Sequence, residues 1–93
     1  MREKKKPTFE SGRMVATHGV IERVSSEDIV LGLRRHLACD WGEVCEEDKE
    51  LNDYAVKKGN RIHSAYLSKD GVRFWIITEA DRSATTVLLP DEY

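Results

Sequence analysis

The turn signal at residues 69–71 (Lys-Asp-Gly) constrains the fold more than any other feature of the sequence. An Asp-Gly pair between runs of β-branched and aromatic residues is typical of a β-hairpin. Residues 61–67 alternate imperfectly, whereas residues 72–78 are apolar almost throughout, as expected for a central strand covered on both faces. A third run, residues 84–89, ends at Pro90, which cannot donate to a sheet. The C-terminal third therefore predicts a three-stranded antiparallel meander.

Two helices are predicted ahead of this meander. Ser25 followed by Asp28 fits a helix cap, and apolar residues then recur at helical spacing, which predicts a helix over residues 26–40. Residues 46–58 place acids first and lysines last, complementing the helix dipole, and a glycine follows. Leu51, Tyr54 and Ala55 form the thin apolar side of this second helix. We expect an α+β fold with both helices packed on one face of the sheet.

Size and composition favour one domain. The chain has 93 residues, of which 40% are hydrophobic and 34% charged, as in ordinary globular domains. No run approaches the roughly 20 apolar residues of a membrane helix, and two cysteines are too few for a disulfide framework. We therefore expect a cytoplasmic protein that does not span a membrane, with a single domain over residues 13–93. Residues 13–16 hold two adjacent apolar residues, but the pattern breaks at once, so a strand there stays open.

The net charge of −2 is unevenly distributed. Four of the first six residues are basic, and we expect residues 1–12 to form a flexible basic tail. Without those four residues and Glu3, 11 Lys and Arg residues face 16 Asp and Glu residues, a net charge of −5 over residues 7–93. A body of that charge repels phosphate backbones, so nucleic-acid binding is not expected for the folded part. The tail alone could still contact RNA or DNA.

Several segments carry a resemblance to a known family. Residues 13–17, Asp-Trp-Gly at 40–42, Ser-Ala-Tyr at 64–66 and the whole run 75–93 resemble a family of small uncharacterised bacterial proteins. Members are often associated with plasmids and other mobile elements, and some carry a restriction-modification label. A DNA methylase needs a Rossmann-like sheet and a Gly-rich cofactor loop, and this chain has neither the length nor the motif. The resemblance implies no established catalytic residues.

Two constellations could carry chemistry. His36, Cys39 and Cys45 are types that bind zinc, but a fourth ligand is not evident, so we expect no metal, and no cofactor motif is present. His63, Glu79 and Arg82 could instead serve as acid, base and phosphate-holding cation of a small barnase-like or RelE-like ribonuclease or toxin. The acidic body weakens that interpretation. Glu79 and Arg82 could equally form an ion pair or hold the loop in place.

An acidic stretch is the other candidate. Residues 40–53 hold seven acids against Lys49, with Trp41 among them, a pattern that could bind a basic protein partner or imitate the charge of nucleic acid, as an anti-defence protein would. A solvated helix face is the alternative. Residues 79–83 form a second candidate surface, a loop without turn chemistry in which Asp81 would accept from backbone amides and Arg82 would reach outward. The predicted partner-binding residues are Asp40, Trp41, Glu43, Glu46, Glu47, Glu50, Asp81 and Arg82.

These patterns favour a non-catalytic interaction module of mobile-element type. The small ribonuclease or toxin and the anti-defence protein remain the alternatives, and whether the chain is an enzyme stays open.

Overall fold

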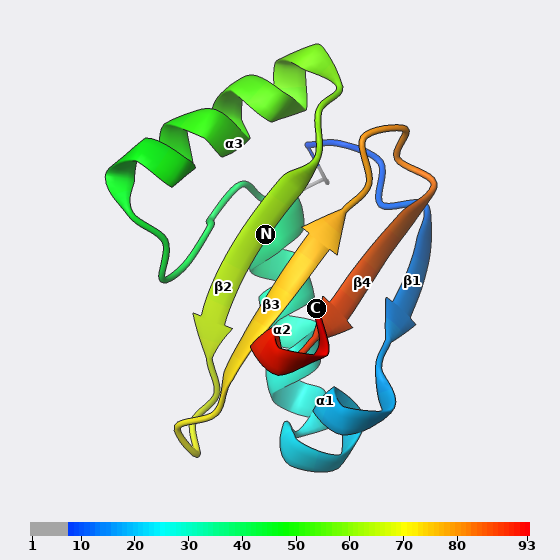
Figure 1. Ribbon diagram of the computed structural model, residues 1–93, viewed down its shortest axis with the longest axis vertical. Helices are drawn as coiled ribbons and strands as arrows, with labels where there is room; N and C mark the ends of the chain where they lie inside the picture. The colour runs from blue at the N-terminus through cyan, green and yellow to red at the C-terminus, as the bar shows by residue number, and fades with distance from the viewer. Residues whose placement is uncertain (1–7) are drawn as a thin grey trace, which may run out of the picture.

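The computed structural model describes residues 8–93. Residues 1–7, which hold the basic cluster of the expected tail, lie outside the described part, so the prediction of a flexible tail there stays a prediction. The elements run in the following order (Figure 1): β1 (Arg13–Ala16), α1 (His18–Arg23), α2 (Ser26–Leu37), α3 (Glu46–Lys58), β2 (Ile62–Leu67), β3 (Arg73–Thr78), β4 (Ala84–Leu88) and the 3-10 helix η1 (Pro90–Glu92).

The sheet confirms the α+β class and corrects its detail. Its four strands lie in the order β1-β4-β3-β2, with β2, β3 and β4 antiparallel and β1 parallel to β4. The predicted three-stranded antiparallel sheet is therefore wrong, because residues 13–16 add a fourth strand and make the sheet mixed. Three of the four residues of β1 are exposed. A short edge strand of this kind buries too little to show the alternation that reveals a strand.

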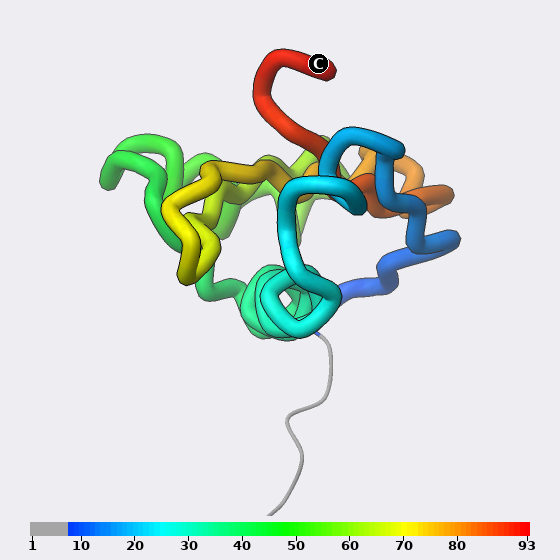
Figure 2. Tube along the Cα trace, turned by 90° about the horizontal axis from the view of Figure 1, so that it is seen from below, coloured from blue at the N-terminus to red at the C-terminus, as the bar shows by residue number. Residues whose placement is uncertain are grey.

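The main core lies between α2 and one face of the sheet (Figure 2). The side chain of Ser25 accepts from the Asp28 backbone N–H at 3.1 Å, as the capping pattern predicts. At Gly32 the helix approaches the sheet so closely that a Cβ would lie 3.0 Å from the ring of Phe74. The buried members of this core are Val20, Val24, Tyr66, Phe74, Ile76, Val87 and Leu89.

Helix α3 flanks the β2 edge instead of joining α2 on the same face, so the expected placement of both helices on one face is wrong (Figures 1 and 2). Asn52 donates to the His63 carbonyl at 2.8 Å and accepts from the His63 N–H at 3.1 Å. The Asn52 side chain thus pairs with the His63 N–H and carbonyl on the edge of β2, two backbone groups that a neighbouring strand would otherwise pair with. This role places the polar Asn52 on the buried side of α3 and leaves Leu51 and Tyr54 outside.

Residues 8–12, the last five of the expected tail, contact the domain. The ring of Phe9 stacks on that of Trp41 with centroids 6.3 Å apart, and the Thr8 N–H donates to the Leu37 carbonyl at 2.8 Å. The Ser11 carbonyl accepts from the Thr85 hydroxyl at 2.7 Å.

Among residues 8–93, no helix has the length and apolar character needed to cross a membrane.

Candidate functional site

A groove of about 450 Å³ lies between α3 and the face of the sheet opposite α2. Its volume falls in the range of ligand sites, roughly 300–1,000 Å³. One wall includes Glu43, Asp48 and Leu51, and the floor includes His63 and Trp75. The register pairs Ala65 with Trp75 and His63 with Ile77, so the outward side chains of β2 and β3 form this floor together.

The groove floor is aromatic and carries a neutral histidine. The His63 and Trp75 rings meet edge to face with centroids 4.4 Å apart, and the Tyr93 ring lies 5.9 Å from that of Trp75. Burial, and after it the charge of Arg61, lowers the pKa of His63, while Asp48 opposes that shift. His63 is therefore uncharged at neutral pH.

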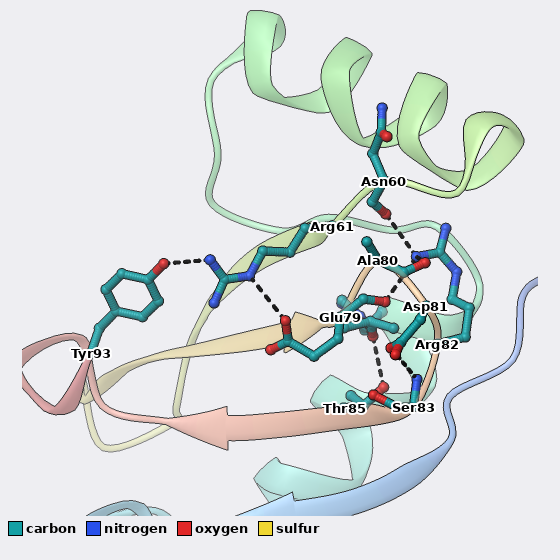
Figure 3. Close-up of polar contacts among 11 residues, drawn as sticks. Asn60, Arg61, Glu79, Ala80, Asp81, Arg82, Ser83, Thr85 and Tyr93 are labelled. Carbon is teal, nitrogen blue, oxygen red and sulfur yellow. Dashed lines mark hydrogen bonds and ion pairs between the residues drawn. The ribbon is translucent and has the colours of Figure 1, made fainter.

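Arg61 stands at one end of the groove between an acid and an aromatic ring (Figure 3). Its Nε lies 3.6 Å from a Glu79 carboxylate oxygen, and its Nη1 donates to the Tyr93 hydroxyl at 2.6 Å. The guanidinium also lies 5.2 Å from the centre of the Tyr93 ring. The charge of Arg61 is thus already matched by Glu79.

Arg82 does not reach outward as expected. Its backbone is left-handed, with φ of 60°, and its side chain turns back over the loop toward the end of α3 (Figure 3). Four carbonyls accept hydrogen bonds from its guanidinium: Ala55 at 2.9 Å, Asn60 at 2.7 Å, Glu79 at 3.1 Å and Ala80 at 3.3 Å. The expectation of a free, outward Arg82 is wrong, because its guanidinium gains charge-assisted hydrogen bonds to backbone carbonyls at the end of α3 and in the 79–83 loop.

Asp81 holds the same loop in the way that the sequence predicts. Its carboxylate accepts from the Ser83 N–H at 2.9 Å, and hydrogen bonds from Ser83 lower its pKa. Glu79 is paired with Arg61 and Arg82 is bonded to carbonyls, and within residues 8–93 neither makes a hydrogen bond or ion pair with His63. Among the described residues, no hydrogen bond is made by the ring nitrogens of His63. The ribonuclease function stays a prediction.

Two members of the predicted acidic surface are occupied by structural contacts. Asp40 accepts from Arg35 Nε at 2.8 Å and Nη2 at 3.2 Å, and this pairing lowers its pKa. Trp41 is only 3% exposed and donates from its indole N–H to Asp53 at 2.9 Å. The structure therefore places Trp41 in a second core cluster, with Ala55 and Ile62, and not on a surface that a partner could contact.

The remaining acids are exposed. Glu46 lies 3.4 Å from Lys49. Within residues 8–93, no ion-pair partner lies near Glu43, Glu47, Asp48 or Glu50. These four residues form an uncompensated negative surface along the first half of α3 and the segment before it.

Sequence reasoning missed the apolar pair on this surface. Leu51 is 63% exposed and Tyr54 is 55% exposed, and they border an open hollow of about 660 Å³ with Glu47, Asp48 and Glu50. The helical spacing of Leu51 and Tyr54 indicated an apolar side, but we expected that side to be packed. Ala55 of that side is buried together with Asn52, so the helix is rotated from the expected orientation, and the spacing of its apolar residues did not indicate this rotation.

The three residues considered as zinc ligands, His36, Cys39 and Cys45, do not form a shared site. The His36 ring bonds to the hydroxyls of Ser64 at 2.5 Å and Thr78 at 2.8 Å, so both of its nitrogens are occupied. Burial lowers the pKa of His36 to about 3. Cys39 and Cys45 are free thiols. In the described part of the chain, no group of three His, Cys, Asp or Glu residues could hold a metal ion.

Comparisons with protein-family models, curated proteins and solved structures found no match. The resemblance to small mobile-element proteins therefore stays a prediction.

Proposed function

We propose that the domain is a non-catalytic interaction module that binds a basic protein segment through the exposed face of α3. This face consists of Leu51 and Tyr54 with the acids Glu47, Asp48 and Glu50 around them. An apolar centre with a charged rim has the composition of a protein-binding surface. The acids would steer a basic segment toward it and favour it over acidic competitors.

The single observation that carries this proposal is the outward placement of Leu51 and Tyr54 on α3. A solvated helix would turn its two large apolar residues inward and its amide outward. Here Asn52 is 5% exposed, whereas Leu51 and Tyr54 are both more than half exposed. Because Asn52 and Ala55 fix the buried side, the helix presents the apolar pair on a rigid support.

Affinity capture from cells that express the chain tests the proposal. We expect a protein partner to copurify with the unmodified domain and to be lost, by about tenfold or more, when Leu51→Ser and Tyr54→Ser are combined. Glu47→Lys with Glu50→Lys should have the same effect through charge. Val30→Ser with Leu31→Ser is the matched control, since these residues are 49% and 53% exposed on α2. Equal capture by the α3 variants and the control would contradict the proposal.

The alternatives give different outcomes in solution. Cleavage of labelled RNA or DNA that is abolished by His63→Ala would establish the ribonuclease or toxin. A captured partner that binds DNA, and that DNA displaces from the domain, would favour the anti-defence protein.

A further inference from the structure

The groove over Trp75 and the face of α3 are parts of one continuous surface. Asp48 and Leu51 line both the groove and the hollow beside α3. Leu51 is 63% exposed and forms the ridge between them. A segment bound to α3 would therefore lie at the mouth of the groove, within reach of its floor.

The floor of the groove suits a flat or charged group that stacks on an aromatic ring. Trp75 is partly exposed there, although its neighbours on the same strand, Phe74 and Ile76, are buried. The His63 and Trp75 rings pack in an edge-to-face contact with centroids 4.4 Å apart. Trp is the aromatic side chain over which a cation is held most strongly.

The charged residues around the groove favour a ligand of one charge sign. Arg61 is matched by Glu79 at 3.6 Å. Arg73 is exposed at the start of β3, at the other end of the groove. Glu43 and Asp48 also line the groove and make no ion pair within residues 8–93, so these two acids outnumber Arg73, the lining cation that Glu79 does not match. The carboxylates of Glu47 and Glu50 beside the mouth add to this negative charge.

We infer that this groove binds an arginine or lysine side chain of the basic segment, stacked on Trp75 and paired with Glu43 and Asp48. The inference rests on the proposed function and gives it a residue-level anchor. Arg61, which also lines the groove, is held by Glu79 and Tyr93. A side chain with an apolar stem and a cationic end is complementary to the apolar ridge of Leu51 and the acids beyond it.

Nuclear magnetic resonance of the ¹⁵N-labelled chain tests the inference, because Trp75 and Trp41 are the two tryptophans and give separate indole signals. The probe is a blocked peptide of alternating glycine and arginine, titrated at physiological ionic strength. We expect a saturable shift of the Trp75 indole signal with little change at Trp41, which is buried. A glycine-serine peptide of the same length and adenosine monophosphate should leave Trp75 unchanged.

A matched pair of variants tests the role of the acids. Glu43→Gln with Asp48→Asn should raise the Kd of the arginine peptide about tenfold. Glu10→Gln with Glu22→Gln removes the same charge from exposed positions elsewhere and should change the Kd less than about twofold. Equal weakening by both pairs, an unmoved Trp75 signal, or a Trp75 shift with adenosine monophosphate alone would overturn the inference.

The two proposals can fail separately. If the arginine peptide binds at Trp75 but the α3 variants still capture the cellular partner, the proposed function is wrong and the groove remains a site for cations. If the α3 variants lose the partner but the peptide leaves Trp75 unmoved, the inference about the groove is wrong.

Discussion

The two faces of the sheet each hold a histidine, and the two histidines are used in opposite ways. His36 comes from α2, is fully buried and has hydroxyl partners at both ring nitrogens. His63 belongs to β2, is half-buried in the groove and meets the Trp75 ring in an edge-to-face contact. The pKa of each is lowered mainly by burial, so the pKa alone does not separate them. What separates the two histidines is the hydrogen bonding of their ring nitrogens, which have partners in His36 and none within residues 8–93 in His63.

On the α2 face the polar groups form a closed chain. Neutral His36, protonated at Nε2, can accept from Ser64 and donate to the hydroxyl of Thr78. The Thr78 hydroxyl lies 2.7 Å from that of Thr85, which donates to the Ser11 carbonyl. Every link then has one donor and one acceptor, which is the arrangement that a buried polar network needs. No group of this hydrogen-bonded network is therefore left over to bind a ligand.

Replacement of the two histidines should give the largest contrast. His36→Ala leaves the Ser64 and Thr78 hydroxyls without their partner inside a cavity, and we expect it to lower the free energy of unfolding by about 3–5 kcal/mol. His63→Ala should lower it by less than about 1 kcal/mol, because its ring faces an open groove. Urea unfolding followed by circular dichroism measures both. Similar losses for the two variants would contradict the division into a closed and an open face.

Two arginines that contact the 79–83 loop, Arg82 within it and Arg61 beside it, should show a similar but smaller difference in stability. Arg82→Ala removes hydrogen bonds to four carbonyls, and we expect a loss of about 2–3 kcal/mol. Arg61→Ala removes an ion pair whose Arg61 side chain is 46% exposed, and should cost less than about 1 kcal/mol. Thermal unfolding at fixed pH provides the comparison. A larger loss of stability for Arg61→Ala than for Arg82→Ala would contradict the structural role assigned to Arg82.

Local sequence signals predicted the elements better than their arrangement. The Ser25 cap and the turn at residues 69–71 depend on neighbours in the chain, and both are present, with Gly71 at φ of 85° and the Ser68 N–H bonded to the Val72 carbonyl at 2.9 Å. The pairing of β1 with β4 joins Arg13 to Ala84, far apart in the sequence. Pairing over that distance depends on the assembled sheet, so the two adjacent apolar residues at 13–16 left a strand open without indicating its partner.

The candidate site was predicted in part, for the same reason. The acidic stretch is visible in the sequence because it depends on composition. That Trp41 is buried, that Asn52 serves the β2 edge and that Leu51 is therefore exposed all depend on where α3 docks. Arg82 was misplaced because an arginine that binds backbone carbonyls looks, in sequence, like one that faces water.

The dependence of stability on pH should show the smallest of these contrasts and its clearest sign. The pKa of His36 is about 3 in the folded chain, against an ordinary value of 6.5, so between these values only the unfolded chain binds the proton. The stabilisation is therefore complete above pH 6.5 and is lost as the pH falls, by about 2 kcal/mol between pH 7.5 and pH 5. Asp40, Asp81 and Glu92, whose pKa values are lowered, act in the same direction at lower pH, since their ordinary values lie near 4. Urea unfolding between pH 7.5 and pH 5 therefore isolates the histidines. His36→Gln should flatten the pH dependence and His63→Ala should retain most of it, and an unchanged slope in His36→Gln would show that the closed chain around His36 does not exclude the proton.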